Sequence, residues 1–143
     1  ISGEFKAVEK AVEIAKQKGK KALLLRVGGA FHSLLMLSAK ADLKPELDKL
    51  NFQPAQIPVV ANVTARPGSN SEQIKELLVE QITMPVLWSR SLEFMSNQGV
   101  TNFVEMGPGK VLQGLVKKTI PGASISGIDK LSDLQKLGQI RTR

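Results

Sequence analysis

The chain has 143 residues, of which 42% are apolar and 23% are charged, and its net charge is +7. These values are those of one ordinary globular domain, so disorder is not expected. The absence of cysteine excludes disulfides, thiolate metal sites and a cysteine nucleophile. No apolar run is long enough to cross a membrane. We therefore expect a soluble protein of the cytoplasm.

The positive charge favours an anionic partner such as nucleic acid, a phosphorylated cofactor or an acidic protein. Nucleic acid is disfavoured because aromatic residues make up only 4% of the chain and tyrosine is absent, so few side chains can stack on bases. The lysines are also spread along the sequence. A solvated basic surface is the simpler interpretation, and we expect no nucleic-acid partner.

Residues 1–27 predict one helix followed by one strand. Apolar residues at helical spacing begin at Phe5, and Gly19 is a natural helix end. The apolar run 22–27 then predicts a short buried strand. After it, residues 34–50 predict a helix interrupted by Pro45, which could start a second short helix. The β-branched stretch 57–65 predicts a second strand.

The remaining residues continue the alternation of strands and helices. Ser69, Asn70 or Ser71 can cap a helix that continues to about Ile82, and a helix beginning at Trp88 ends at Gly99. The pattern then predicts, in order, a strand at 102–106, a basic helix at 110–118, a strand at 124–129 and a last helix at 131–140. This alternation indicates an α/β fold with a mainly parallel sheet.

His32 is the only histidine, and it lies in the stretch GGAFHSLLM. Gly28 and Gly29 allow a sharp turn just before it. The preceding strand places it near a sheet edge, where α/β sites gather. A histidine there can act as general acid and base. The alternative is an ordinary histidine hydrogen-bonded to the backbone.

Other motifs are weaker. GPGK at 107–110 can present backbone N–H groups to a phosphate, but it also suits a simple strand–helix turn, which the pattern favours. The chain contains neither a GxxxxGK[ST] loop nor a GxSxG elbow. No cluster of acidic residues and histidine has metal-ligand spacing, so we expect no metal site.

Five blocks stand out in chain order: ISGE, GAFHSLLM, IPVVANVTA, EQITMPVLWSRSLEFM and NFVEMGPGKVLQGLVKK. Taken together, they resemble the malonyl-CoA:acyl carrier protein transacylase family of fatty acid and polyketide synthesis. The resemblance covers nearly the whole chain, and its specificity lies in the combination and order of the blocks.

The resemblance implies that His32 is the general base that activates a serine nucleophile in a ping-pong transfer of malonyl from coenzyme A to acyl carrier protein. It also implies that Gln81 orients the imidazole through its main-chain carbonyl. Phe31 matches the residue that favours malonyl over the branched methylmalonyl group. Leu34 departs from the proline usual in this motif. Malonyl-CoA is expected as a substrate, with no permanently bound cofactor.

The family's serine motif, GHSLGE, is absent from these residues. The chain is therefore expected to be the C-terminal half of such an enzyme, partnered by an N-terminal half that carries the serine. Residues 1–27 would end a ferredoxin-like small subdomain, and residues 28–143 would form part of the large hydrolase-like subdomain.

One more partner, acyl carrier protein, follows from the resemblance besides malonyl-CoA and the missing half. Acyl carrier proteins are acidic, so a basic surface suits them, and one group of lysines provides candidate contacts: Lys110, Lys117 and Lys118. The alternative function is a non-catalytic module that binds acyl carrier protein or coenzyme A through the GPGK turn and the basic helix.

Overall fold

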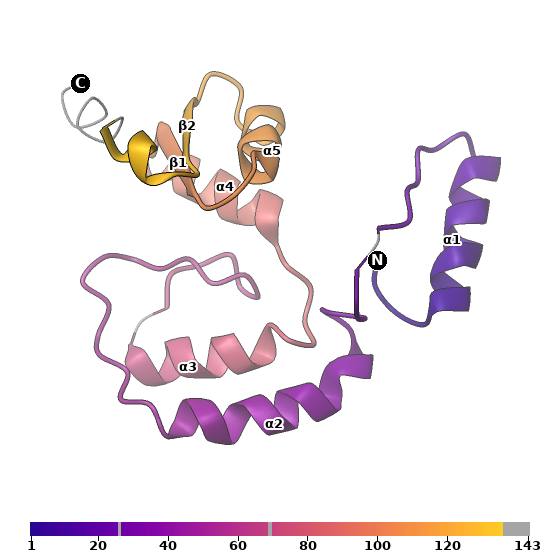
Figure 1. The fold of residues 1–143 in the computed structure, drawn as a ribbon, viewed down its shortest axis with the longest axis horizontal. Coiled ribbons are helices and arrows are strands. Elements are labelled where there is room, and N and C mark those ends of the chain that lie inside the picture. The colour runs from indigo at the N-terminus through magenta and orange to yellow at the C-terminus, as the bar shows by residue number, and fades with distance from the viewer. Residues whose placement is uncertain (26, 69, 136–143) are drawn as a thin grey trace. The chain divides into compact units, whose positions relative to one another are not determined.

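The computed structural model describes residues 1–25, 27–68 and 70–135, which group into two compact units, Ile1–Leu87 and Trp88–Arg143 (Figure 1). The first unit contains helices α1 (Phe5–Gln17), η1 (Leu34–Met36), α2 (Leu37–Asp48) and α3 (Ser71–Glu80). The second contains α4 (Trp88–Asn97), β1 (Asn102–Met106), α5 (Val111–Thr119), β2 (Ser124–Ile128) and η2 (Leu131–Leu134).

The helix α1 forms where the apolar spacing predicts it and is followed by Gly19 at a φ of 68°. This left-handed conformation suits glycine, which explains the helix end. The strand predicted at 22–27 is absent from the described residues of that segment, and Arg26 lies outside them. Leu23 is 83% exposed. A strand needs a neighbour to pair with, and the apolar pattern alone does not supply one.

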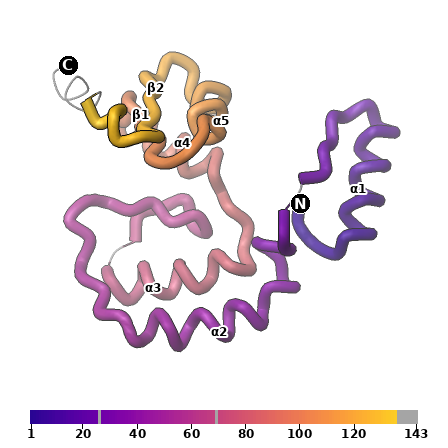
Figure 2. The backbone as a smooth tube through the Cα atoms, in the orientation of Figure 1, coloured from indigo at the N-terminus to yellow at the C-terminus, as the bar shows by residue number. Residues whose placement is uncertain are grey.

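Helices α2 and α3 lie side by side and run in opposite directions (Figure 2). Pro45 lies inside α2, so the predicted interruption there is wrong and one helix continues past it. Among the predicted capping residues, Asn70 is the N-cap of α3, because its side chain accepts a hydrogen bond from Gln73 N–H at 2.9 Å. Ser69 lies outside the described residues.

The stretch 57–65 does not form the predicted strand. In the described residues this stretch pairs only through one antiparallel bridge, between Val60 and Pro67. Ile57, at its start, is 74% exposed. A tight loop follows, in which Ala65 is buried at a φ of 54°. The β-branched residues give the segment its extended tendency, but a strand again requires a partner edge.

The second unit is a parallel β1–α5–β2 arrangement with α4 packed against α5. Phe103 pairs with Ile125 and Val104 with Ser126 in the register of the two strands. The α/β fold class with a parallel sheet is therefore confirmed, although the described residues supply two of the four predicted strands. The described part of the last predicted helix is the short η2, and residues 136–143 lie outside the description.

The carboxylate of Glu105, at the end of β1, caps the N-terminus of α5. Its two oxygens accept hydrogen bonds from Leu112 N–H at 3.1 Å and Gln113 N–H at 3.2 Å. Desolvation acts to raise the pKa of Glu105, but these backbone donors, with the Gln113 side chain, hold it below its ordinary value. The ionised carboxylate therefore contributes to the stability of this unit.

We predict that Glu105→Gln destabilises the second unit near neutral pH. Because the folded-state pKa is lowered, the contribution is fully present above the unfolded-state pKa and is lost as the pH falls through the folded-state value. The difference from wild type should therefore shrink in acid. Urea unfolding, followed by the fluorescence of Trp88, the only tryptophan, measures this difference in unfolding free energy.

The matched control is Glu93→Gln, at an exposed position of α4. Equal urea midpoints for the wild type and both variants would contradict the prediction.

Candidate active site

His32 lies in a tight turn that its neighbours hold in place. Its φ of 64° is unusual for a residue other than glycine, so the turn must be held by contacts around it. Its own N–H donates to the carbonyl of Ile82 at 3.0 Å. Ser33 donates its hydroxyl to the carbonyl of Ala30 at 2.7 Å and accepts from Leu35 N–H at 3.3 Å, which caps η1. These contacts fix the backbone on both sides of the imidazole.

The imidazole itself contacts the end of α3. His32 Nδ1 lies 2.7 Å from the main-chain oxygen of Gln81, a residue 49 positions away in the chain. A carbonyl oxygen can only accept, so Nδ1 must carry the proton that this bond uses. The neutral ring then has a free lone pair on Nε2, as a general base requires. The structure thus brings together two residues that the sequence singled out.

Gln81 is held at the C-cap of α3. Its N–H donates to Leu77 O at 3.1 Å. The preceding residue, Glu80, forms an ion pair of 2.7 Å with Lys40 of α2, which ties the end of α3 to the helix that follows the histidine turn. The Gln81 carbonyl therefore lies at the end of α3, and the ion pair to α2 fixes the position of that end.

Phe31 directly precedes His32 and is 51% exposed. Its ring lies over Gly29, where an added Cβ would meet the ring at 3.2 Å. About half of the Phe31 side chain is therefore open to solvent and is not buried in a core.

Asn62 is a site neighbour that the sequence analysis missed. Its side-chain Nδ2 donates to Gln81 Oε1 at 3.0 Å, and its main-chain oxygen accepts from Leu87 N–H at 2.8 Å. A hollow of about 300 Å³ is lined by Asn62 and Gln81 together with apolar residues of α3 and of the segment 59–61. The only sequence signal was an asparagine inside an apolar stretch, which is weak.

The GPGK turn is the strand–helix connection that the pattern favoured. Gly107 and Gly109 have φ values of 137° and 92°, and Gly107 N–H donates to Ile128 O. The Glu105 carboxylate already fills the N-terminus of α5, where a phosphate would bind. This occupancy counts against a phosphate site at this turn.

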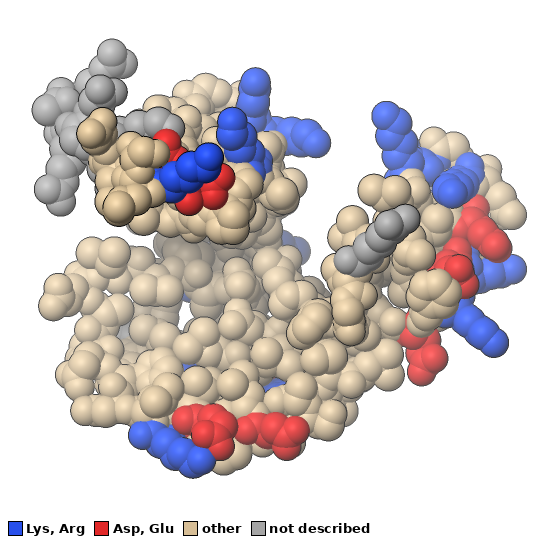
Figure 3. All heavy atoms as spheres, in the orientation of Figure 1, with Lys and Arg blue, Asp and Glu red and all other residues tan. Residues whose placement is uncertain are grey.

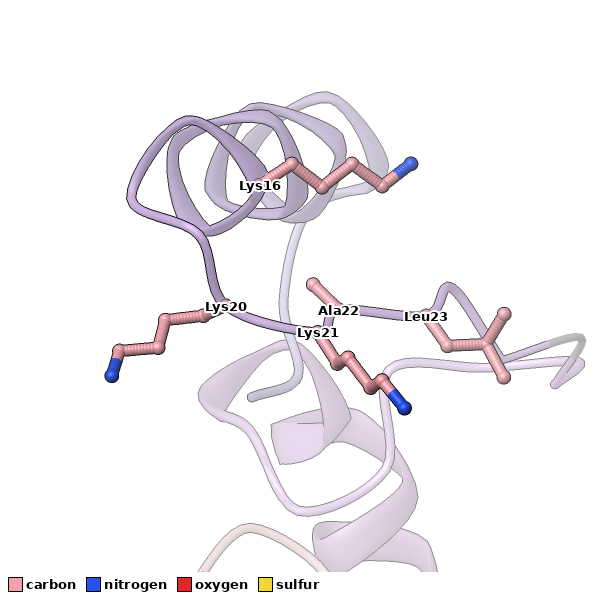
Figure 4. A pocket seen from close by; sticks show the side chains of 5 residues that line it. All are labelled: Lys16, Lys20, Lys21, Ala22 and Leu23. Carbon is pink, nitrogen blue, oxygen red and sulfur yellow. The ribbon is translucent and has the colours of Figure 1, made fainter.

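The basic residues do not converge on a single anion site in the parts that Figures 3 and 4 display. Over α1, blue and red side chains alternate (Figure 3). A hollow of about 480 Å³ is lined partly by Lys16, Lys20 and Lys21, but their amines point in different directions (Figure 4). Lys110, Lys117 and Lys118 are exposed, and the last two lie at the C-terminus of α5, where the helix dipole favours positive charge.

Neither a metal cluster nor a membrane span is found in the described residues. No group of three or more acidic residues and histidine there could hold a metal ion, and no helix there is long and apolar enough to cross a bilayer.

Comparison with curated proteins finds relatives with one common name. The chain is 48% identical over 119 residues to a malonyl CoA-acyl carrier protein transacylase of Bacillus subtilis strain 168, covering 82% of the chain and 38% of that relative. It is 37% identical over 137 residues to the transacylase of Synechocystis, covering 96% of the chain and 46% of the relative. The chain thus spans about two fifths of the length of these relatives. No family model matches it.

Solved structures give the same result. An acyl-carrier-protein S-malonyltransferase from Bartonella henselae superimposes with a TM-score of 0.90 at 39% identity, over 96% of this chain and 44% of that one. A malonyl-transacylase solved in complex with its type II PKS acyl-carrier protein gives a TM-score of 0.85 at 37% identity, over 96% and 45%.

We predict that the neutral imidazole of His32 carries its proton on Nδ1. Free histidine prefers the other tautomer, so the hydrogen bond to Gln81 O must reverse that preference. Nitrogen-15 NMR at alkaline pH reports the two ring nitrogens separately, and the single histidine makes assignment unambiguous. A ring protonated mainly on Nε2 would contradict the geometry.

Proposed function

Because this chain belongs to the malonyl CoA-acyl carrier protein transacylase family, we propose that it is the C-terminal part of an enzyme that transfers malonyl groups from coenzyme A to acyl carrier protein. Malonyl-CoA is the donor and the phosphopantetheine thiol of the carrier is the acceptor. The relatives' names and the high structural similarity over almost the whole chain support this activity.

The proposed mechanism is a double displacement through an acyl-enzyme. His32 Nε2 takes the proton of a serine hydroxyl, whose oxygen attacks the malonyl thioester. The protonated imidazole gives its proton to the departing thiolate of coenzyme A. The same nitrogen then takes the proton of the phosphopantetheine thiol, whose sulfur attacks the malonyl-serine ester, and the serine oxygen regains a proton from the imidazole. One thioester is broken and one is formed, so the exchange is nearly balanced.

The single observation that carries the proposal is the bond of 2.7 Å between His32 Nδ1 and Gln81 O. In serine–histidine sites a third group orients the ring and favours the tautomer that leaves Nε2 free. A main-chain carbonyl does both here without adding a charge. The left-handed backbone of His32 is consistent with a site that holds strain for function.

The nucleophilic serine belongs to the partner that we propose for this chain, the N-terminal half of the same enzyme. Three exposed apolar side chains support the need for such a partner: Leu23, Ile57 and Leu34. The first two lie in segments that the sequence predicts as strands but that lack a full ladder in the described residues. In this proposal residues 1–27 complete the small subdomain and residues 28–143 complete the large one.

Phe31 is proposed to select the acyl group. A ring beside the imidazole narrows the space at the α-carbon of the acyl chain, so a branch methyl would clash with it. Its half-exposed position next to His32 is consistent with contact to a substrate.

Acyl carrier protein is the proposed macromolecular partner, and the cytoplasm is the proposed location. The related malonyl-transacylase was solved with its carrier, and a net charge of +7 suits an acidic protein. The proposed contacts are Lys110, the N-cap residue of α5, and Lys117 and Lys118 in its last turn. The alternative, a non-catalytic module that binds through the GPGK turn, is disfavoured because Glu105 already occupies that helix terminus.

We predict that His32→Ala lowers transfer to acyl carrier protein by about a thousandfold in the complete enzyme, because the general base is lost. Gln81→Ala should cost far less, since its main-chain carbonyl remains. Steady-state transfer assays with malonyl-CoA measure both. Equal activity of wild type and His32→Ala would contradict the proposed role, and equal losses in the two variants would contradict the role of the carbonyl.

We further predict that Phe31→Ser lowers the preference for malonyl-CoA over methylmalonyl-CoA by about tenfold, as expected when one methyl group is accommodated. The measurement is the ratio of kcat/KM values for the two donors. Leu35→Ala, at another exposed apolar position of the same segment, is the control and should leave the ratio unchanged. If the ratio of kcat/KM values is unchanged in Phe31→Ser, Phe31 does not select the acyl group.

A further inference from the structure

We propose that Asn62 is a positioning residue for the proposed transfer: it fixes the turn whose carbonyls hold His32, and it acts through the side chain of Gln81. The inference rests on the proposed function only for its effect on turnover. Its effect on the imidazole stands on the geometry alone.

The first step is the pair of contacts at Gln81. Its main-chain oxygen accepts from the imidazole at 2.7 Å, and its side-chain oxygen accepts from Asn62 Nδ2 at 3.0 Å. One residue is thus held at both its backbone and its side chain. If both amides were turned over, Gln81 would donate and Asn62 would accept, so the contact does not depend on the assignment of either amide.

The second step is the clamp across the turn. Asn62 binds Gln81 with its side chain and Leu87 with its main-chain oxygen, at 2.8 Å, so it contacts the residues on either side of the segment 82–86. The two carbonyls that hold His32, those of Gln81 and Ile82, lie at the start of this turn. Asn62 therefore closes the turn that presents them.

The third step is the rigidity of the loop that carries Asn62. Ala61 N–H donates to Arg66 O at 2.9 Å, and Ala65 N–H donates back to Ala61 O at 2.9 Å. Val60 bridges to Pro67, and Ala65 is buried. These main-chain bonds do not use the Asn62 side chain, so the loop can position the Asn62 amide without help from it.

The contact is also sheltered from solvent. Asn62 and Gln81 are both half-buried, and apolar side chains of α3, among them Leu77 and Leu78, line the same hollow. A half-buried amide that loses its hydrogen-bond partner is only partly compensated by water. Breaking the Asn62–Gln81 hydrogen bond therefore costs free energy, which favours the paired state.

The test uses the tautomer of His32, read by nitrogen-15 NMR at alkaline pH. We expect Asn62→Ala to lower the ratio of the Nδ1-protonated to the Nε2-protonated form by roughly threefold, the scale of part of one neutral hydrogen bond. The Leu87 bond, which uses the main chain, remains in this variant. Thr64→Ala removes a side-chain contact to Arg66 O within the same loop and should leave the ratio unchanged.

A double-mutant cycle decides whether Asn62 acts through Gln81. Gln81→Met has a similar length but lacks the amide, while its main-chain carbonyl stays. If the side-chain bond is the route, then Asn62→Ala, Gln81→Met and the double variant should give the same ratio. Additive effects would overturn the route, and an unchanged ratio in Asn62→Ala would overturn the proposal.

Kinetics of the complete enzyme separate this inference from the proposed function. We expect Asn62→Ala to lower kcat by at most about twofold, with little change in KM for malonyl-CoA. The effect is smaller than the roughly threefold change in the ratio because the reactive tautomer predominates in the wild type. If the wild-type enzyme transfers no malonyl but the tautomer ratio shifts, the proposed function fails and the positioning role stands. If transfer occurs and the ratio does not shift, the positioning role fails alone.

Discussion

The site depends on one hydrogen bond between the imidazole of His32 and the main-chain oxygen of Gln81. A side-chain carboxylate can orient an imidazole from many positions, but a main-chain carbonyl has the direction that its backbone gives it. The bond therefore requires that the end of α3 and the histidine turn each be fixed. The Lys40–Glu80 ion pair, the Ser33 cap and the Asn62 contacts all act on one of those two segments.

The two units differ in how many of their strand edges, helix ends and apolar side chains have partners within the same unit. In Trp88–Arg143 the two strands pair with each other, and Glu105 supplies the cap that α5 needs. In Ile1–Leu87 the histidine turn is well braced, but the segments 22–25 and 57–59 keep apolar side chains exposed. The second pattern is typical of segments that complete a larger sheet, and it agrees with relatives more than twice as long.

Sequence patterns correctly predicted the elements that are stabilised by contacts within this chain. The helix at Trp88, its end at Gly99 and the strand pair 102–106 and 124–128 follow from periodicity and from partners within the chain. The strands expected at 22–27 and 57–65 could not be judged in this way, because a strand forms only where the edge of a neighbouring strand is available for pairing.

The acceptor role of Gln81 is invisible to pattern reasoning, since every residue has a carbonyl, and only the family resemblance indicated it. Asn62 could not be found because a side-chain hydrogen bond to a residue 19 positions away leaves no periodic pattern in the sequence. The assignment of residues 1–27 and 28–143 to two subdomains stays a prediction.

The most direct test of His32 as general base is a denaturing intact-mass spectrum of the complete enzyme, recorded within the first turnover after mixing with malonyl-CoA. We expect the wild type to gain one malonyl group on a serine outside these 143 residues, and His32→Ala to gain it far more slowly. Labelling at the same rate in both proteins would show that the serine is activated without this histidine. That result would contradict the role of the His32–Gln81 pair.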